Sequence, residues 1–244
     1  MDNITLWQGD CLELMKNIPD RSVDFIFADL PYGTTNCVWD SVIDLDLLWK
    51  QYKRVRKNNT AIVLFAQTPF DKVLGMSNIS ELRYEWIWEK TQATGHLNAK
   101  KMPMKAHENL LVFYKNLPTY NPQKTYGHRP TNSYTKYVET QNNTEIYNRM
   151  SLEISGGGNT DRYPRSVQVF SSDKQKSKLH STQKPLALCE YIVKTYTNEG
   201  DTVLDNTCGS GTTLVACQTT NRKGIGIEKD EKIYRVARNR VFSY

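Results

Sequence analysis

Short apolar runs alternate with amphipathic stretches in the first and last parts of this chain. The apolar runs at 23–28, 61–66, 202–204 and 224–227 have the composition of strands buried on both faces of a sheet. Between the first two runs, apolar side chains recur at helical spacing, at Leu45, Leu48, Trp49, Tyr52 and Val55. Strands that alternate with helices predict an α/β fold with a mostly parallel sheet.

Weaker patterns add further elements around these runs. Strands are predicted at 4–9, 82–88 and 109–114. Helices are predicted at 12–18, at 45–56, from Pro69 with Thr68 as its cap, after Pro185, after Thr213 and at 230–240. The helix after Pro185 has one apolar face, formed by Leu188, Cys189, Ile192, Val193 and Tyr196.

The pattern dissolves between about Asn116 and Thr182. This stretch is rich in Asn, Tyr, Thr and Ser, contains three consecutive glycines at 156–158, and shows no sustained helical or strand period. A loop of this length is uncommon in a compact domain and indicates function or disorder. Its tyrosines argue against simple disorder. We therefore expect a single domain over 1–244 that carries an inserted region at 116–180.

Charge is distributed unevenly along the 244 residues. The formal net charge is +6, and residues 90–194 hold 16 Lys and Arg but only 7 Asp and Glu. A basic middle in an otherwise near-neutral chain favours a polyanionic partner. A solvated polar surface explains the charge equally well.

Several classes of protein are disfavoured by what the sequence lacks. It has no apolar run near the ~18 residues of a membrane-spanning helix and no signal-like N-terminus, so we expect a soluble intracellular protein. The five cysteines are scattered and odd in number, which argues against a disulfide framework. The four histidines lack metal-ligand spacing, and no metal site is expected.

A glycine-containing turn, Asp205–Thr213, lies between a predicted strand and a predicted helix. Glycines let a ligand approach the backbone, and the start of the helix offers N–H donors to an anion. Glu228 ends the next strand, where a carboxylate can accept both hydroxyls of a ribose. The fingerprint of a nicotinamide-binding enzyme would need a third glycine where Leu214 stands. A ligand with a carboxylate in place of a pyrophosphate fits this turn better, and S-adenosylmethionine is such a ligand. The alternative is a turn that merely links strand to helix.

A second candidate is Asp29-Leu30-Pro31-Tyr32, at the carboxyl end of a buried strand. An exocyclic base amine is a poor nucleophile because its lone pair is delocalised into the ring. The Asp29 carboxylate and the Leu30 carbonyl can accept the amino hydrogens and aim the lone pair at a methyl group. Pro31 stiffens the turn, and Tyr32 offers a face for stacking. Methyl transfer is then a direct displacement governed by alignment. The alternative is a strand-terminating turn with an incidental tyrosine.

Together and in this order, the two motifs resemble the β class of DNA amino-methyltransferases, whose motif order is circularly permuted. Three other segments are similar to family elements: His180–Pro185, Lys105–Glu108 and Trp88–Lys90. The resemblance covers nearly the whole chain except about 116–178. It implies a Rossmann-like S-adenosylmethionine-dependent methyltransferase fold with a mostly parallel, seven-stranded sheet.

The resemblance also implies roles for individual residues. Asp10 would contact the adenine of the cofactor and Glu228 its ribose. Thr212 or Thr213 would bind the carboxylate, and Lys184-Pro185 would lie near the methionine moiety. The other expected cofactor residues are Asp205, Gly209, Ser210 and Gly211. Two departures from the family pattern are Leu30 in place of a proline, and Asn206-Thr207-Cys208 beside the glycines.

The implied reaction is methylation of an exocyclic amine in double-stranded DNA, with the base flipped out of the helix. The acidic Asp29 favours adenine N6 over cytosine N4. A cytosine C5 enzyme is disfavoured because no Pro-Cys pair occurs. A protein glutamine methyltransferase usually has the cofactor motif first. A DNA-binding protein with a degenerate cofactor site remains a further alternative.

The inserted region would recognise the DNA target. Its candidate DNA contacts are Arg129, Arg149, Arg162, Arg165, Lys174, Lys176 and Lys178. Trp39-Asp40 is a candidate for the base pocket, with core packing of Trp39 as the alternative. The resemblance further implies a homodimer and a bacterial or phage-encoded enzyme of the cytoplasm, which acts either with a restriction endonuclease partner or as an orphan enzyme. The recognition sequence cannot be derived.

Overall fold

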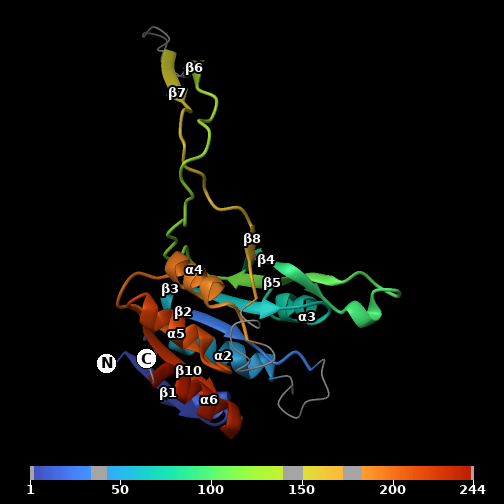
Figure 1. Ribbon diagram of the computed structural model, residues 1–244. Coiled ribbons are helices and arrows are strands. Elements are labelled where there is room, and N and C mark those ends of the chain that lie inside the picture. Colours follow the sequence, from blue (N-terminus) through green and yellow to red (C-terminus); the bar gives the residue numbers. More distant parts are fainter. Residues whose placement is uncertain (1–2, 34–42, 140–150, 173–182, 243–244) are drawn as a thin grey trace. The chain divides into compact units, whose positions relative to one another are not determined.

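The chain is described by a computed structural model over residues 3–33, 43–139, 151–172 and 183–242. Its core is an eight-stranded sheet (Figure 1). The order across the sheet is β1 (Ile4–Gln8), β10 (Lys223–Glu228), β9 (Thr202–Asp205), β2 (Val23–Asp29), β3 (Arg56–Ala66), β5 (Lys105–Phe113), β4 (Leu82–Thr94) and β8 (Val167–Phe170). Only β5 is antiparallel to its neighbours. The predicted α/β class is confirmed. The sheet has eight strands and not seven, because β8 pairs with β4 at the edge.

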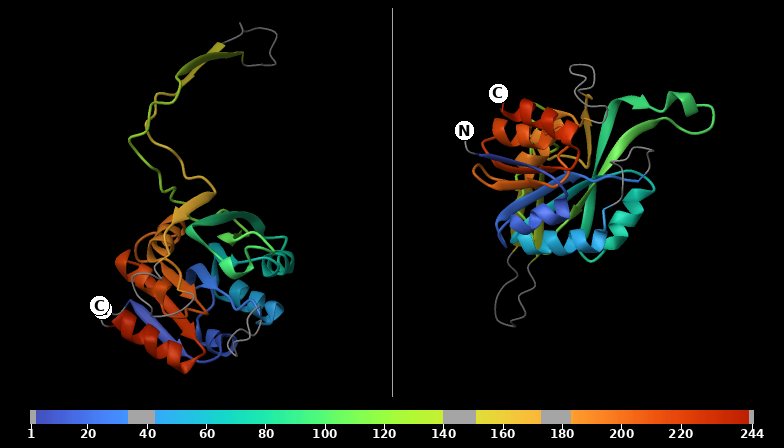
Figure 2. Two further views of the ribbon diagram at one scale, coloured as in Figure 1. Left: turned by 45° about the vertical axis from the view of Figure 1, so that its right-hand side comes forward. Right: turned by 90° about the horizontal axis from the view of Figure 1, so that it is seen from below.

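Helices cover both faces of this sheet (Figures 1 and 2). One face carries α1 (Cys11–Leu14), α2 (Leu45–Val55) and α3 (Phe70–Ser77). The other face carries α4 (Leu186–Tyr196), α5 (Thr212–Thr219) and α6 (Glu231–Phe242). None of the helices in the described ranges is long and apolar enough to cross a membrane.

Burial on both faces explains the continuous apolar run of β2. Phe25 and Phe27 pack in the core beneath α4 and α5, while Ile26 and Ala28 pack in the core beneath α2. Successive side chains of a strand point to opposite faces, so a strand with helices on both sides must be apolar throughout. The apolar face predicted for α4 is likewise confirmed as buried.

Some element bounds differ from those predicted. Pro69 is the N-cap of α3 and not its first residue. The first helix is α-helical only to Leu14 and continues as a 3-10 turn, Met15–Asn17. β4 and β5 extend to Thr94 and from Lys105, joined by the 3-10 turn His96–Asn98. These extensions lack an apolar face, so the apolar pattern missed them.

Residues Pro122–Pro164 form a separate compact unit. Its two strands, β6 (Tyr134–Glu139) and β7 (Ser151–Gly156), pair antiparallel, and backbone bonds between Thr125 and Arg162 continue the ribbon. Side chains such as Tyr134 and Ile154 are exposed, which explains why no strand period was apparent. At Gly157 φ is +99°, and a Cβ would lie 2.2 Å from the Asn132 backbone oxygen. Glycine is therefore required there.

Candidate active site

The turn after β2 presents Asp29 near the centre of the sheet, between β9 and β3. One carboxylate oxygen of Asp29 accepts a hydrogen bond of 2.7 Å from the Tyr32 hydroxyl. The other lies 2.9 Å from the Lys184 ammonium. Phe70, the first residue of α3, stacks on Tyr32 with ring centroids 5.2 Å apart. The Leu30 side chain is buried in the core. The carboxylate is thus held from two sides.

Lys184 is one member of a buried charge chain, Lys90–Glu108–Lys184–Asp29. Glu108 lies 2.8 Å from Lys184 and 2.6 Å from Lys90. The side chains of Lys90, Glu108 and Lys184 are at most 13% exposed, while Asp29 is 29% exposed. Charges of alternating sign compensate one another where water cannot. Of these four side chains, that of Asp29 is the one exposed to solvent to an appreciable degree.

The surroundings keep Lys184 and Glu108 ionised. Burial works to lower the pKa of Lys184, but Asp29 and Glu108 together raise it above its ordinary value. Burial works to raise the pKa of Glu108, but Lys184 and Lys90 bring it below its ordinary value. Both groups therefore stay charged at neutral pH.

Strand periodicity explains why these residues meet. Asp29 lies two residues after Phe27, and Glu108 two residues before Leu110, so both share the sheet face covered by α4. Lys90 likewise follows Trp88 by two residues, and Trp88 pairs with Glu108 across β4 and β5. Lys184 stands two residues before α4 on that face.

The glycine turn after β9 is held by two carboxylates. Glu228, at the end of β10, accepts backbone N–H bonds from Gly209 (2.9 Å) and Asp230 (2.8 Å). Asp205 accepts one from Thr207 (3.1 Å). Gly209 has φ +52°, and a Cβ added to it would meet no atom within 4 Å. The backbone here borders open space and can be approached by a ligand.

Unlike the ion-paired Asp29, Asp205 is engaged by hydrogen bonds from Thr207 and Thr213. Burial raises the pKa of Asp205 to about 7, although hydrogen bonds from Thr213 and Thr207 act to lower it. Burial also raises the pKa of Glu228. A carboxyl with a pKa near 7 exchanges its proton around neutrality.

A hydrogen bond joins the glycine turn to the end of β2. The Thr207 hydroxyl donates to the Asp29 backbone oxygen over 3.0 Å. The strands that carry the two turns are neighbours, with Ile26 opposite Leu204. Motifs far apart in the sequence therefore form one site.

Asp10 joins this site from the end of β1. It caps α1 by accepting the Leu12 N–H over 3.0 Å, and it lies 3.3 Å from the Lys229 ammonium. The Gly9 N–H donates to the Glu228 backbone oxygen over 2.9 Å. Asp10 and Glu228 thus stand at the ends of paired strands.

α6 supports the far side of the glycine turn. Arg240 donates to the Thr212 hydroxyl over 2.8 Å and to the backbone oxygen of Ser210 over 3.3 Å. Gly211 has φ +79°, and a Cβ there would lie 3.1 Å from Val241 of α6. The turn is therefore packed on one side and open beside Gly209.

Several residues of the site were not predicted. Lys90, Glu108, Phe70, Thr207 and Arg240 had no assigned role. The signal for Lys90 and Glu108 was present, because both stand in segments that resemble family elements. Lys184 is predicted beside the methionine moiety of the cofactor, and in the structure it contacts Asp29 and Glu108. No comparable signal marked Phe70.

The predicted DNA contacts are divided between several parts of the chain. Arg129 and Arg162 belong to the 122–164 unit, and Arg165 is exposed just before β8. Arg162 donates to backbone oxygens of Asn159, Asp161 and Arg129, so it organises its own unit. Outside the described residues lie Arg149, Lys174, Lys176, Lys178, Trp39 and Asp40.

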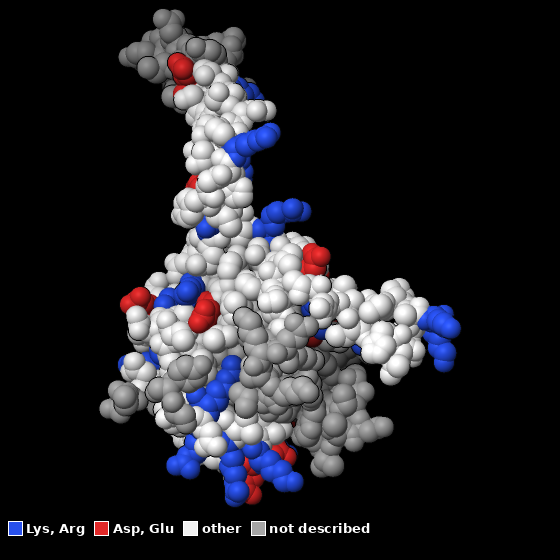
Figure 3. Space-filling view, in the orientation of Figure 1, with Lys and Arg blue, Asp and Glu red and all other residues white. Residues whose placement is uncertain are grey.

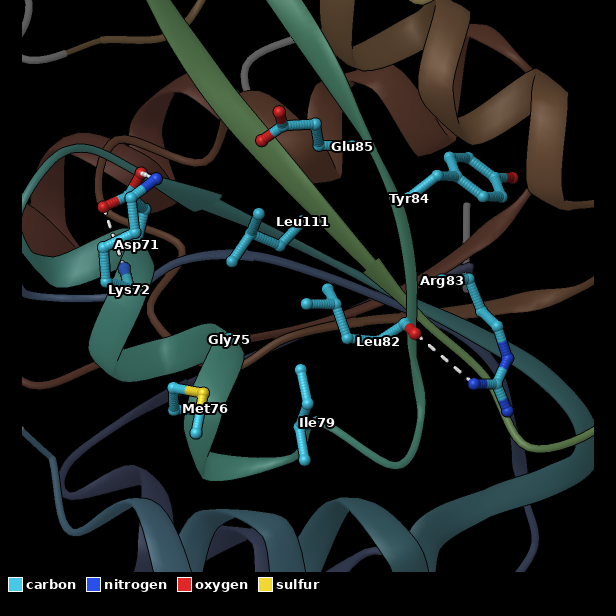
Figure 4. A pocket seen from close by; sticks show the side chains of 10 residues that line it. All are labelled: Asp71, Lys72, Gly75, Met76, Ile79, Leu82, Arg83, Tyr84, Glu85 and Leu111. Atoms are coloured by element: carbon cyan, nitrogen blue, oxygen red, sulfur yellow. Dashed lines mark hydrogen bonds and ion pairs between the residues drawn. The ribbon is translucent and has the colours of Figure 1, made fainter.

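A hollow of about 400 Å³ lies between α3 and β4 (Figure 4). Its lining includes Asp71, Met76, Ile79 and Tyr84. The Asp71 carboxylate is engaged by Lys72 over 2.8 Å. None of the predicted site residues lines this hollow.

Comparisons with known proteins agree with this geometry. The profile of a family described as DNA methylase matches residues 23–239. The chain is 28% identical to the type II methyltransferase M.HinfI of Haemophilus influenzae over 97% of this chain and 68% of that protein. It is also 28% identical to the DNA adenine methyltransferase YhdJ of Escherichia coli (strain K12), over 97% and 82%. The solved M1.HpyAVI–SAM complex has the same fold, with a TM-score of 0.66, 23% identity, and 98% and 99% coverage.

Proposed function

The chain belongs to the DNA methylase family, and we propose that it transfers a methyl group from S-adenosylmethionine to adenine N6 in double-stranded DNA. The observation that carries the proposal is the 3.0 Å hydrogen bond from Thr207 to the Asp29 backbone. It joins the loop suited to the methyl donor to the turn suited to the accepting amine. The name of YhdJ supports adenine as the target, and the complex of M1.HpyAVI supports the donor.

We assign Asp29 the role of orienting the target amine. Each oxygen of an ionised carboxylate can accept about two hydrogen bonds, and Tyr32 and Lys184 each engage one oxygen. An amino hydrogen adds to the same carboxylate, and the Leu30 carbonyl accepts the second. The nitrogen lone pair then points towards the methyl group. Pro31 stiffens the turn, and Tyr32 stacks on the flipped base.

Lys184 acts as a positioning residue for Asp29. Its second ion pair, with Glu108, is anchored in turn by Lys90. An ammonium fixed between two carboxylates holds Asp29 in one direction. Preorganised charge of this kind needs no rearrangement during the reaction.

S-adenosylmethionine supplies a methyl group on a positively charged sulfur, and the surroundings of the glycine turn suit its other parts. Glu228 would accept the ribose hydroxyls, and Asp10 would contact the adenine. Thr212 and Thr213 would bind the carboxylate near the start of α5. The remaining proposed contacts are Lys184, Pro185, Asp205, Gly209, Ser210 and Gly211. The open space beside Gly209 fits such a ligand.

We propose that the inserted region at 116–180 recognises the target sequence. Arg129 and Arg165 are exposed and can contact phosphates or guanine edges. The proposal extends to Arg162, Arg149, Lys174, Lys176 and Lys178. Replacing Arg165 with alanine should weaken DNA binding while the affinity for S-adenosylmethionine stays the same. Unchanged DNA binding would remove Arg165 from this role.

The family resemblance supports three further proposals. The enzyme would form a homodimer, act in the cytoplasm of a bacterial or phage-infected cell, and protect DNA from a partner restriction endonuclease. Sedimentation velocity tests the first. Protection of methylated DNA from digestion by the host's own extract tests the last.

The reaction is tested by incubating the protein with unmethylated genomic DNA and labelled S-adenosylmethionine, then identifying the labelled nucleoside by mass spectrometry. N6-methyladenine is the expected product. N4-methylcytosine would keep the chemistry of Asp29 and overturn the choice of base. Label in protein instead of DNA would favour the glutamine methyltransferase alternative.

A further inference from the structure

The hairpin formed by Thr91–His107, here called the β4–β5 arm, extends beyond the end of the sheet at which Asp29 lies. The register fixes its place: Asp29 pairs with Phe65, the next residue Ala66 pairs with Asn109, and Asn109 pairs with Ile87. β4 then continues to Thr94, which at the usual strand rise is about 20 Å further. Figures 1 and 2 show the arm reaching away from the helices.

The arm carries positive charge without any negative charge. Lys100, Lys101 and Lys105 are exposed, as are His96 and His107. No Asp or Glu occurs between Glu89 and Glu108. Figure 3 shows lysine side chains, in blue, at the end of the arm, with no acidic side chain beside them. A purely basic, solvent-exposed projection is complementary to a polyanion.

Apolar side chains accompany these cations. Leu97 is 88% exposed, Met102 52% and Met104 41%. Leu97 lies in the 3-10 turn at the tip, which backbone bonds from Asn98 and Met102 keep ordered. The fold of the arm does not explain why three apolar residues stand on one tip, because every residue from Thr91 to His107 is exposed.

We propose that the β4–β5 arm is a second DNA-contacting element, with its lysines on phosphates and Leu97 against the bases beside the target. The proposal rests on the proposed function and extends it. A base flipped towards Asp29 leaves a gap in the stack, and proteins that distort DNA commonly insert apolar side chains between bases. The arm continues the two strands that carry Lys90 and Glu108, so DNA bound there lies on the same strands as the partners of the reacting carboxylate.

The charge of the arm is tested with K100A/K101A against a matched control, K115A/K223A. Lys115 and Lys223 are also exposed, but they lie at the opposite edge of the sheet, after β5 and at the start of β10. Binding to a mixed-sequence DNA duplex is measured by fluorescence anisotropy at several salt concentrations. The arm variant should bind more weakly. The magnitude of its slope of log affinity against log salt concentration should fall by up to about 2. The control should keep the wild-type slope, and equal slopes in both variants would overturn the proposal.

The apolar tip is tested with Leu97→Ser. Turnover on unmethylated genomic DNA should fall more than DNA affinity does, by roughly 10-fold against twofold or less, because the stack is no longer filled. Equal losses in turnover and affinity, or none, would overturn the role of Leu97. If the variant instead converts a dimer to a monomer in sedimentation, the arm is a self-association surface and the proposal fails.

These outcomes are separable from failure of the proposed function. Wild-type protein that binds S-adenosylmethionine but labels no DNA would refute the proposed function. The salt dependence of DNA binding would still decide whether the arm contacts DNA.

Discussion

Asp29 and Asp205 occupy equivalent places at the ends of neighbouring parallel strands, yet their surroundings differ in kind. Asp29 is held by the hydroxyl of Tyr32 and the ammonium of Lys184. Asp205 is held by a backbone N–H and by Thr213, and burial raises its pKa to about 7. The turn after β2 is thus organised by side-chain charge, and the glycine turn after β9 by backbone hydrogen bonds. The end of a strand therefore fixes where each carboxylate lies, whereas partners from other elements determine its electrostatic surroundings.

The strongest way to break this comparison is Asp29→Ala. Without the carboxylate, the amine is not oriented, and transfer should fall by about 10³-fold or more. The glycine turn keeps its own carboxylates, so S-adenosylmethionine should bind as before in calorimetry. Substantial residual turnover would remove Asp29 from its role.

The second way is to cut the buried charge chain with Lys184→Met. Asp29 then loses its ion pair and Glu108 keeps only the one with Lys90, so the free energy of unfolding should fall by about 3–5 kcal/mol. Turnover should fall about 100-fold through kcat, since Asp29 loses its direction. Lys184→Arg keeps the charge and serves as the control.

A purely structural role of Lys184 can be separated from positioning with the triple variant K90M/E108Q/K184M. Removing all three buried charges together leaves none of them without a partner and should restore most of the stability measured in urea. Turnover should stay low, because Asp29 remains without its cation. Full recovery of turnover would show that Lys184 contributes only to stability.

The third test concerns Asp205, through pH. Its pKa is raised from the ordinary value to about 7, so the folded state binds a proton that the unfolded state releases near pH 4. The contribution of Asp205 to stability is complete below about pH 4 and is lost as pH rises towards 7. Asp205→Asn should therefore flatten this loss in urea unfolding series. A variant with an unchanged pH profile would contradict the raised pKa.

The mildest test removes the link between the two turns with Thr207→Val. One hydrogen bond between a hydroxyl and a carbonyl is worth about 0.5–1.5 kcal/mol. We expect a two- to tenfold lower kcat with little change in the affinity for S-adenosylmethionine. Thr219→Val is a suitable control, since the Thr219 hydroxyl contacts Glu190 and Ala216, away from both turns. Equal effects of the two changes would argue against coupling between the turns.

The sequence predicted the parts of the fold that apolar periodicity governs. The strands around Phe27 and Val63 and the buried face of α4 were all located, because burial on one or two faces leaves a readable pattern. The sequence did not predict β8, the β6–β7 ribbon or the arm. Exposed ribbons are held by backbone hydrogen bonds, which any side chain permits, so they leave no apolar pattern in the sequence.

For the site, the sequence identified the residues that lie within contiguous motifs, such as Asp29 and Gly209. It did not reveal the ion pairs of Lys184, because Glu108 and Lys90 come from other strands and converge only through register. The motif assignments themselves stay predictions until the variants above are measured.

The strand order β1-β10-β9-β2 has a consequence for synthesis of the protein. β1 and β2 are made first but are separated in the sheet by β9 and β10, which begin only at Thr202 and Lys223. On the ribosome, β1 and β2 must therefore wait for these partners until residues 202–228 have emerged. Truncation before Thr202 would remove both partner strands. The enzyme completes its central sheet, and with it both halves of its site, only after β10 has been made.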